Sequence, residues 1–326
     1  MTPPDELIRV LGDLRQPVIG GHINPDVDAM GSMLALARAL PSRGAIALPR
    51  GHVGKKVAFL RQLAPEVPVA DADRQAAADA FVVLDTATTS RININGTWEA
   101  IADRFVINID HHITNADYGQ INWIVDDASS TSEMVFHLIR AAGWPIDGAT
   151  ASLLYAGLYA DTAGFSLPSA TPQAFEAAAA LVRLGADIER VGTYLCRSQH
   201  LSEFELLRRV YHNTRLVENG TISYSTLTYE EITSSGCTPE DIDDQVSIPR
   251  SLSGIRIAML FSEIEPGVIR INLRGENGTP VLPIAVKLGG GGHRFSAGVR
   301  IRGPIASIVE RVIAEAVAYL AAPESA

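Results

Sequence analysis

The sequence has very little cysteine, since only Cys196 and Cys237 occur among 326 residues. Two cysteines outside a C-x-x-C pair form neither a disulfide framework nor a cysteine-ligated zinc site, which favours a reducing, cytoplasmic setting. The longest apolar runs, such as residues 81–84, fall far short of the roughly 20 residues that a transmembrane helix needs. The N-terminal residues lack the basic flank and apolar stretch of a signal peptide. We therefore expect a cytoplasmic protein with no membrane partner.

The sequence also lacks any run of basic residues, and its formal net charge is −10. Proteins that hold long nucleic acids need arrays of lysine and arginine to displace counterions. We therefore expect no long duplex as a partner, whereas a short phosphate ligand held by metals and a few arginines is compatible with this charge. The hydrophobic share of 47% is that of a globular protein. A chain of this length is expected to form two domains.

The first half of the chain alternates between short apolar segments and helical segments. The short segments are rich in Val or Ile, as strands buried on both faces are. This alternation predicts an α/β fold, with a mostly parallel sheet and helices on both faces. The expected strands are residues 17–21, 45–48, 81–84, 104–109 and 123–125, and the expected helices are residues 29–40, 53–63, 132–142, 149–159 and 172–184.

The pattern changes after about residue 185. Residues 221–228, 254–263 and 268–274 have β-type composition, and Glu265-Pro266-Gly267 predicts a hairpin turn between the last two. Residues 201–211 are expected to form a helical connector and residues 305–320 an amphipathic helix. We predict a first domain over residues 1–190, a helical linker over residues 191–214, and a smaller mixed α/β domain over residues 215–326.

Acidic and histidine side chains occur in four clusters where strands or helices of the first domain should end. In an open parallel sheet, ligands bind outside the carboxyl ends of the strands. Carboxylate and imidazole ligands without thiolate suit Mn²⁺, and four carboxylates match the charge of two divalent cations. The clusters contain His22, Asp26 and Asp28, then Asp85, then Asp110-His111-His112, and finally Asp161.

Each cluster alone allows a simpler interpretation. Asp85 could be the N-cap of a helix, and Asp26 and Asp28 could be turn residues beside Pro25. Asp161 could cap the next segment, and a pair of histidines is more often a surface feature than a ligand. The position of all four clusters at the ends of elements favours a common metal site.

The order H-x-x-x-D-x-D, D, D-H-H and D-T-x-x-F resembles the DHH phosphoesterase superfamily. Residues 289–298, GGGGHRFSAG, resemble the G-G-G-H-x-x-A-A-G signature of its DHHA1 domain, with Ser296 where alanine is frequent. Residues 245–254, QVSIPRSLSG, resemble a stretch of the branch that contains nano-RNases, pAp phosphatases and cyclic-di-AMP phosphodiesterases. The resemblance covers nearly the whole chain. It implies a DHH catalytic domain followed by a DHHA1 substrate-binding domain.

The resemblance also implies two Mn²⁺ ions, with Mg²⁺ or Co²⁺ as alternatives, that share and activate a bridging water. One metal would be held by His22, Asp26 and Asp85. The other would be held by Asp28, Asp85, His111 and Asp161, so that Asp85 is both a catalytic residue and the bridge.

His112 is the second catalytic residue that the resemblance implies, because it would face the scissile phosphate rather than a metal. Asp110 would lie behind the ligands and fix a histidine tautomer. The four consecutive glycines at residues 289–292 are expected to form a loop whose backbone N–H groups are open to a phosphate. Arg250 and Arg274 are further phosphate candidates, although a solvated surface position explains either equally well. The substrate-binding residues that we expect are Gly290, Gly291, Gly292, His293, Arg274 and Arg250.

The leading hypothesis is a metal-dependent hydrolase of short nucleotides: oligoribonucleotides of a few residues, 3′-phosphoadenosine 5′-phosphate (pAp), or linear and cyclic dinucleotides. The alternatives are a family II-like inorganic pyrophosphatase, a processive single-strand exonuclease and a non-catalytic nucleotide-binding regulator. The glycine signature argues against the first alternative, the chain length against the second, and the intact ligand positions against the third. The resemblance also implies a homodimer.

Overall fold

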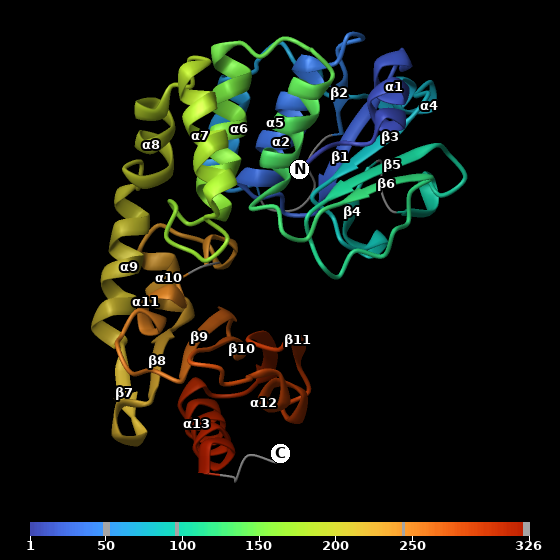
Figure 1. Cartoon of the computed structure of the whole chain (residues 1–326). Helices are drawn as coiled ribbons and strands as arrows, with labels where there is room; N and C mark the ends of the chain where they lie inside the picture. The colour runs from blue at the N-terminus through green and yellow to red at the C-terminus, as the bar shows by residue number, and fades with distance from the viewer. Residues whose placement is uncertain (48–52, 95–97, 243–244, 322–326) are drawn as a thin grey trace. The chain divides into compact units, whose positions relative to one another are not determined.

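The computed structural model describes residues 1–47, 53–94, 98–242 and 245–321 (Figure 1). The chain forms two compact units, Met1–Ser198 and Gln199–Ala326. The division falls within the segment 191–214 that the sequence assigns to a linker, and that segment contains the end of one helix and the whole of the next. Among the described residues, no helix combines the length and the apolar character needed to cross a membrane.

A mostly parallel sheet of six strands forms the centre of the first unit. Its order is β2-β1-β3-β5-β6, all neighbours are parallel, and β4 pairs antiparallel with β1. The α/β prediction is therefore confirmed, although β4 was not foreseen, and residue 48 of the second expected strand lies outside the described residues. The strands are β1 (Val18–His22), β2 (Ala45–Ile46), β3 (Phe81–Leu84), β4 (Ile92–Asn93), β5 (Val106–Asp110) and β6 (Ile121–Ile124).

Eight α-helices accompany this sheet in the described part of the first unit, and α2, α5 and α6 pack against one another (Figure 1). The single helix expected over residues 53–63 is wrong, because α3 gives way to a 3₁₀ turn at Phe59–Gln62. The helices are α1 (Asp5–Asp13), α2 (Val27–Ala39), α3 (Lys55–Ala58), α4 (Ala72–Ala76), α5 (Thr131–Ala141), α6 (Gly148–Asp161), α7 (Pro172–Arg183) and α8 (Ile188–Cys196).

Both faces of the sheet are buried, which explains why its strands read as continuous apolar runs. Ile19 and Val82 belong to the large core that includes α2, α5 and α6. Their neighbours Val18 and Val83 belong to a second core on the opposite face, which also contains Ile92. Each fully buried side chain of this size contributes about 1.5–3 kcal/mol.

The second unit is built on another six-stranded sheet, in the order β11-β12-β10-β9-β8-β7. The β8–β9 pair is parallel, and the other neighbouring pairs in this order are antiparallel. The strands are β7 (Arg215–Val217), β8 (Ile222–Leu227), β9 (Ile257–Glu265), β10 (Val268–Gly275), β11 (Gly291–His293) and β12 (Ser296–Arg302), and the helices are α9 (Leu201–Asn213), α10 (Tyr229–Ser234), α11 (Ser247–Arg250), α12 (Leu282–Lys287) and α13 (Ile305–Ala321).

Within the glycine-rich segment, Gly291–His293 form the strand β11 rather than the loop that the sequence suggests. Residues of β11 pair with β12 from Gly291 opposite Gly298 to His293 opposite Ser296. A methyl group at Gly290 would lie 2.2 Å from the backbone oxygen of Gly298. Gly292 has φ +139°, a conformation that side chains rarely adopt. Part of the glycine signature is therefore explained by the close approach of β11 and β12.

Glycine also permits the close packing of α2 on α6. A methyl group at Gly31 of α2 would lie 2.7 Å from the backbone oxygen of Leu153 in α6. A backbone atom cannot move aside as the end of a flexible side chain can. The two helices that carry Asp28 and Asp161 therefore depend on this contact for their separation.

We predict that Gly31→Ala lowers the free energy of unfolding by about 1–3 kcal/mol, because it overpacks the α2–α6 contact. Urea denaturation followed by circular dichroism measures this change. Gly12→Ala is the matched control, since a methyl group there comes no closer than 3.8 Å to Trp144. Equal stability of Gly31→Ala and the wild type would contradict the packing argument.

Candidate metal centre

Strands of the first sheet bring the predicted residues to one edge. His22 is the last residue of β1, Asp110 is the last residue of β5, and Asp85 follows β3 directly. Asp85 has φ +54°, a left-handed conformation that is uncommon outside glycine. Such backbone strain is frequent at functional sites. The next helical turn has Thr88 in the N-cap position, so the interpretation of Asp85 as an N-cap is wrong.

The start of α2 supplies Asp26 and Asp28. Asp26 is the N-cap of α2, because its Oδ1 accepts a hydrogen bond from Ala29 N at 2.9 Å. Asp28 lies in the first turn and is buried. Its two carboxylate oxygens accept hydrogen bonds from Thr131 N at 2.7 Å and Ser132 N at 2.9 Å. The N-terminus of α5 therefore fixes the Asp28 carboxylate through its free backbone donors.

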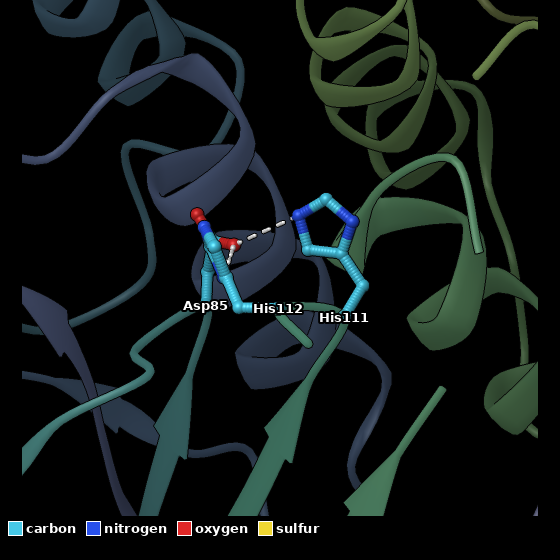
Figure 2. A group of neighbouring side chains, drawn as sticks. All are labelled: Asp85, His111 and His112. Atoms are coloured by element: carbon cyan, nitrogen blue, oxygen red, sulfur yellow. Dashed lines mark ion pairs between the residues drawn. The ribbon is translucent and has the colours of Figure 1, made fainter. Parts of the chain in front are cut away.

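The two oxygens of Asp85 face two different groups of side chains. Figure 2 shows Asp85 with His111 and His112. Oδ2 of Asp85 lies 3.7 Å from His22 Nε2, which is also 3.7 Å from Asp26 Oδ2. Its Oδ1 lies 3.5 Å from His111 Nε2, which is 3.3 Å from Asp161 Oδ2. Asp85 thus stands between two clusters of candidate ligands.

Three sets of side chains have ligand atoms within 4.8 Å of one another among the described residues. Two of them fall within the two predicted ligand sets. The third contains His112, for which the family resemblance implies a substrate-facing role. The sets are His22–Asp26–Asp85, Asp28–His111–Asp161 and Asp85–His111–His112.

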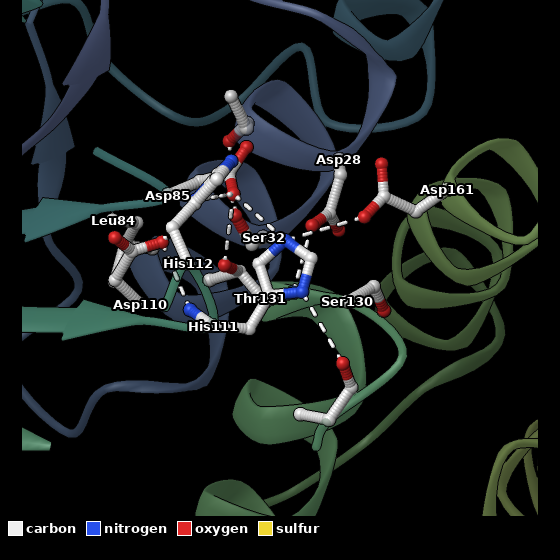
Figure 3. Close-up of polar contacts among 12 residues, drawn as sticks. Asp28, Ser32, Leu84, Asp85, Asp110, His111, His112, Ser130, Thr131 and Asp161 are labelled. Atoms are coloured by element: carbon white, nitrogen blue, oxygen red, sulfur yellow. Dashed lines mark hydrogen bonds and ion pairs between the residues drawn. The ribbon is translucent and has the colours of Figure 1, made fainter. Parts of the chain in front are cut away.

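Asp161 is the last residue of α6, so this candidate ligand comes from a helix end rather than a strand end (Figure 3). The simpler interpretation gave Asp161 the cap of the next segment, but the hydrogen bonds of this turn are made by Thr162. Thr162 Oγ1 donates to Leu158 O at 2.7 Å and accepts from Phe165 N at 3.1 Å. Asp161 itself stays directed toward His111. A capping turn and a candidate ligand therefore lie side by side.

Two histidines present the nitrogen that a metal ligand needs. His22 Nδ1 lies 2.9 Å from Ile23 O, and His111 Nδ1 lies 3.3 Å from Ala128 O. A carbonyl oxygen only accepts, so in the neutral ring each Nδ1 carries the proton and each Nε2 keeps its lone pair. At His22 this contact with Ile23 O, at 2.9 Å, is shorter than the contact of the same Nδ1 with the donor Arg91 Nη2, at 3.2 Å. The ring protonated at Nδ1 is the tautomer that coordinates a metal through Nε2.

Without a cation, the site shifts the pKa values of these histidines upward. Burial alone would lower the pKa of His22, but interactions with Asp26 and Asp85 raise it to about 10. Burial would also lower the pKa of His111, and Asp85 again reverses the effect and raises it to about 10. In the metal-free protein, His22 and His111 therefore carry protons at the positions where a metal cation would bind.

Burial and the neighbouring charges also shift the pKa values of the carboxyl groups. Burial, followed by repulsion from Asp85, raises the pKa of Asp161 to about 7 and that of Asp28 well above its ordinary value. Burial would raise the pKa of Asp85 too, but hydrogen bonding to His111 and His22 lowers it. Buried carboxylates in mutual repulsion, with imidazoles and no thiolate beside them, are donors that fit hard or borderline divalent cations.

His112 has a different partner from His111. Its Nδ1 lies 2.7 Å from Asp110 Oδ1 (Figure 3), and this hydrogen bond raises the pKa of His112. Asp110 is buried, and its Oδ1 also accepts from His111 N at 2.9 Å. Asp110 therefore contacts the second histidine in the way that the sequence expects of a residue fixing a tautomer.

Several side chains at the site were missed by the sequence analysis. Thr131 Oγ1 donates to Asp85 Oδ1 at 3.0 Å. Arg91 Nη2 lies 3.2 Å from His22 Nδ1, and Asn115 Nδ2 donates to Asp110 Oδ2 at 2.6 Å. Asn115 follows the D-H-H triplet closely, so its spacing offered a signal. For Thr131, the sequence indicated only the start of a helix.

The expected substrate-binding residues lie in the second unit. Gly290 precedes β11, Gly291 and Gly292 lie in it, and the side chain of His293 is outside what the structure describes. Arg250 ends α11 and forms an ion pair with Glu276. Arg274 lies in β10, and its Nη1 donates to Leu273 O at 3.1 Å. The phosphate role of these residues remains a prediction.

Fold and site together define a metal-dependent phosphoesterase, and known proteins agree with this class. Residues 16–158 match the DHH family, N-terminal domain. The bifunctional oligoribonuclease and PAP phosphatase of Thermus thermophilus is 31% identical over 296 residues, which cover 90% of this chain and 87% of the relative. The Bacillus subtilis protein of the same name is 29% identical over 304 residues, covering 91% and 92%.

A solved structure shares the fold. An exopolyphosphatase-related protein from Bacteroides fragilis superposes with a TM-score of 0.84 at 24% identity, covering 95% of each chain. The family match and the relatives above lead to one assignment. The chain belongs to the DHH family of phosphoesterases and is a phosphoric ester hydrolase.

We predict that the affinity for Mn²⁺ rises with pH between about pH 6 and pH 8, because metals bind only neutral imidazole. His22 and His111, whose pKa values lie at about 10, hold protons throughout this range in the metal-free protein. Binding must therefore displace protons, and calorimetric titration in buffers of different ionisation enthalpy measures their number. A pH-independent affinity without proton release would contradict this prediction.

We predict that Thr131→Val weakens Mn²⁺ binding by about 10- to 100-fold, because Asp85 loses the donor that orients it. Valine keeps the shape of threonine, and the backbone N–H to Asp28 is unaffected. Thr131→Ser retains the hydroxyl and is expected to bind Mn²⁺ as the wild type does. Equal affinities of the two variants would show that the hydroxyl has no such role.

Proposed function

We propose that the first unit holds two divalent cations, Mn²⁺ by preference. His22, Asp26 and Asp85 would hold one, and Asp28, Asp85, His111 and Asp161 would hold the other. The observation that carries this proposal is the orientation of Asp85, whose two oxygens face His22 and His111 separately. Four carboxylates balance the charge of two such cations. When bound, the cations supply Lewis acidity and positive charge for attack on phosphorus.

Protein groups around the cations keep the ligands in place. The N-terminus of α5 holds Asp28. The carbonyls of Ile23 and Ala128 keep the two ligating imidazoles in the tautomer with a free Nε2. Preorganised ligands need not rearrange when charge develops in the transition state. His112 is proposed to meet the phosphoryl group from the side opposite Asp110.

The proposed substrates are short nucleotides: oligoribonucleotides of a few residues, pAp, or linear and cyclic dinucleotides. The names of the Thermus thermophilus and Bacillus subtilis relatives support the first two classes. The net charge of −10 also favours short substrates over long ones. We propose that Gly290–Gly292, His293, Arg250 and Arg274 of the second unit contribute phosphate contacts, and that the protein is a homodimer.

We predict metal-stimulated release of mononucleotides from a ribodinucleotide, together with release of inorganic phosphate from pAp. Chromatography of products with and without Mn²⁺ measures both reactions. Cyclic dinucleotides and inorganic pyrophosphate complete the panel and rank the substrates. Activity on pyrophosphate alone would favour the pyrophosphatase alternative, and inactivity on every substrate would contradict the proposal.

Asp85→Asn is expected to lower kcat by at least about a hundredfold, because bound metals supply several kcal/mol of charge stabilisation. Asp103→Asn removes the same charge at an exposed position and is expected to retain wild-type kcat. The comparison separates loss of a metal ligand from a general change in surface charge.

A further inference from the structure

Three asparagines form a continuous chain of side-chain amides next to the metal centre. Asn108 of β5 and Asn122 of β6 are partners in the parallel register, and Asn115 lies on the connection between these strands. Asn108 is buried, and its Nδ2 lies 2.8 Å from Asn115 Oδ1 and 3.3 Å from Asn122 Oδ1. Each amide in such a chain constrains the orientation of the next.

Backbone groups fix the direction of this chain at its start. Asn122 Nδ2 donates to Gly119 O at 2.7 Å and to Asp117 O at 3.2 Å. Asn122 Oδ1 accepts from Gly119 N at 2.9 Å. Because Nδ2 has to face two carbonyls, Oδ1 faces Asn108. Asn108 must then present its NH₂ group toward both neighbouring asparagines.

Hydrogen bonds to the backbone fix the orientation of the Asn115 side-chain amide in the same way. Its Oδ1 accepts from Asp117 N at 2.9 Å as well as from Asn108. Its NH₂ group therefore faces the other way, where it donates to Asp110 Oδ2 at 2.6 Å and to Thr86 O at 3.2 Å. The amide orientation is set by backbone atoms on both sides rather than by Asp110 itself.

Each carboxylate oxygen of Asp110 consequently accepts at least one hydrogen bond. Oδ2 accepts from Asn115, and Oδ1 accepts from His111 N and His112 Nδ1. The carboxylate cannot rotate without losing at least one of these bonds. The proton of His112 on this side is therefore held at Nδ1, and Nε2 is the nitrogen left to meet a substrate.

We propose that Asn115 is a positioning residue for phosphoester hydrolysis, acting through Asp110 to hold His112 with Nε2 toward the leaving oxygen. This inference rests on the proposed function. In the step, a water oxygen forms the new bond to phosphorus while the bond from phosphorus to the leaving oxygen breaks. The leaving oxygen keeps the bonding electrons and takes the proton from His112 Nε2. The water releases a proton to solvent, from which His112 regains one.

The leaving group decides how much this alignment matters. A ribose oxygen leaves poorly as an alkoxide and needs a proton in the transition state. A nitrophenolate is stable as an anion and leaves without one. A defect in the orientation of His112 should therefore slow the first reaction and spare the second.

The test compares a ribodinucleotide with the nitrophenyl ester of a nucleoside 5′-phosphate, both with Mn²⁺. Asn115→Ala is expected to lower kcat for the dinucleotide by about 10- to 100-fold, as loss of a residue supporting an active-site histidine does. The KM value and the Mn²⁺ affinity are expected to stay at wild-type values. For the nitrophenyl ester, kcat is expected to stay within about threefold of the wild type, because no general acid is needed.

Two further variants exclude a merely structural role. Asn115→Asp keeps the volume but replaces the donor to Asp110 with an acceptor, so it is expected to lose activity on the dinucleotide as Asn115→Ala does. Tyr118 Oη also donates to Thr86 O, at 2.7 Å. Tyr118→Phe therefore removes an anchor of the same segment without touching Asp110, and it is expected to retain kcat on both esters.

Equal losses on the two esters, a weakened Mn²⁺ affinity, or full activity of Asn115→Asp would overturn the role of Asn115. These outcomes all require a wild-type protein that hydrolyses both esters. Wild-type protein that hydrolyses neither ester would overturn the proposed function, and this inference with it.

Discussion

Repulsion among buried carboxylates at the carboxyl edge of the first sheet is the constraint on which the structure of this protein depends. Asp28 and Asp85 are buried, and Asp161 lies beside the same histidine as Asp85. Water is largely excluded, so the negative charge must be balanced by protein donors, protons or cations. The α5 N-terminus balances part of it at Asp28. The raised pKa values of the histidines show that protons balance another part in the absence of metal.

The rest of the first unit serves to bring these charges together. Parallel strands end at the same edge, so His22, Asp85 and Asp110 meet although they are far apart in sequence. Helices α2 and α6 supply the remaining carboxylates, and glycine at position 31 allows them to pack closely. Apolar burial on both faces of the sheet provides the free energy that holds this arrangement against its repulsion.

The sequence predicts most of the fold and the candidate ligands because both depend on local patterns. Apolar runs predict strands, and polar residues directly after them predict the binding edge. Thr131 could not be predicted, because its partner Asp85 is 46 positions away and only the tertiary fold joins them. The β11–β12 hairpin was missed for another reason. Consecutive glycines suggest a loop, whereas here they allow two backbones to approach.

His111 and His112 are adjacent and chemically identical, so their different proposed roles must come from their surroundings. His111 Nδ1 faces the carbonyl of Ala128, a neutral acceptor that leaves Nε2 free for a cation. His112 Nδ1 faces the carboxylate of Asp110, which favours the protonated imidazole. The carbonyl behind His111 carries no charge, whereas the carboxylate behind His112 stabilises a positive charge on that ring, which suits a proton donor. The different proposed roles of the two histidines in D-H-H therefore follow from the acceptor that the fold places next to Nδ1 of each ring.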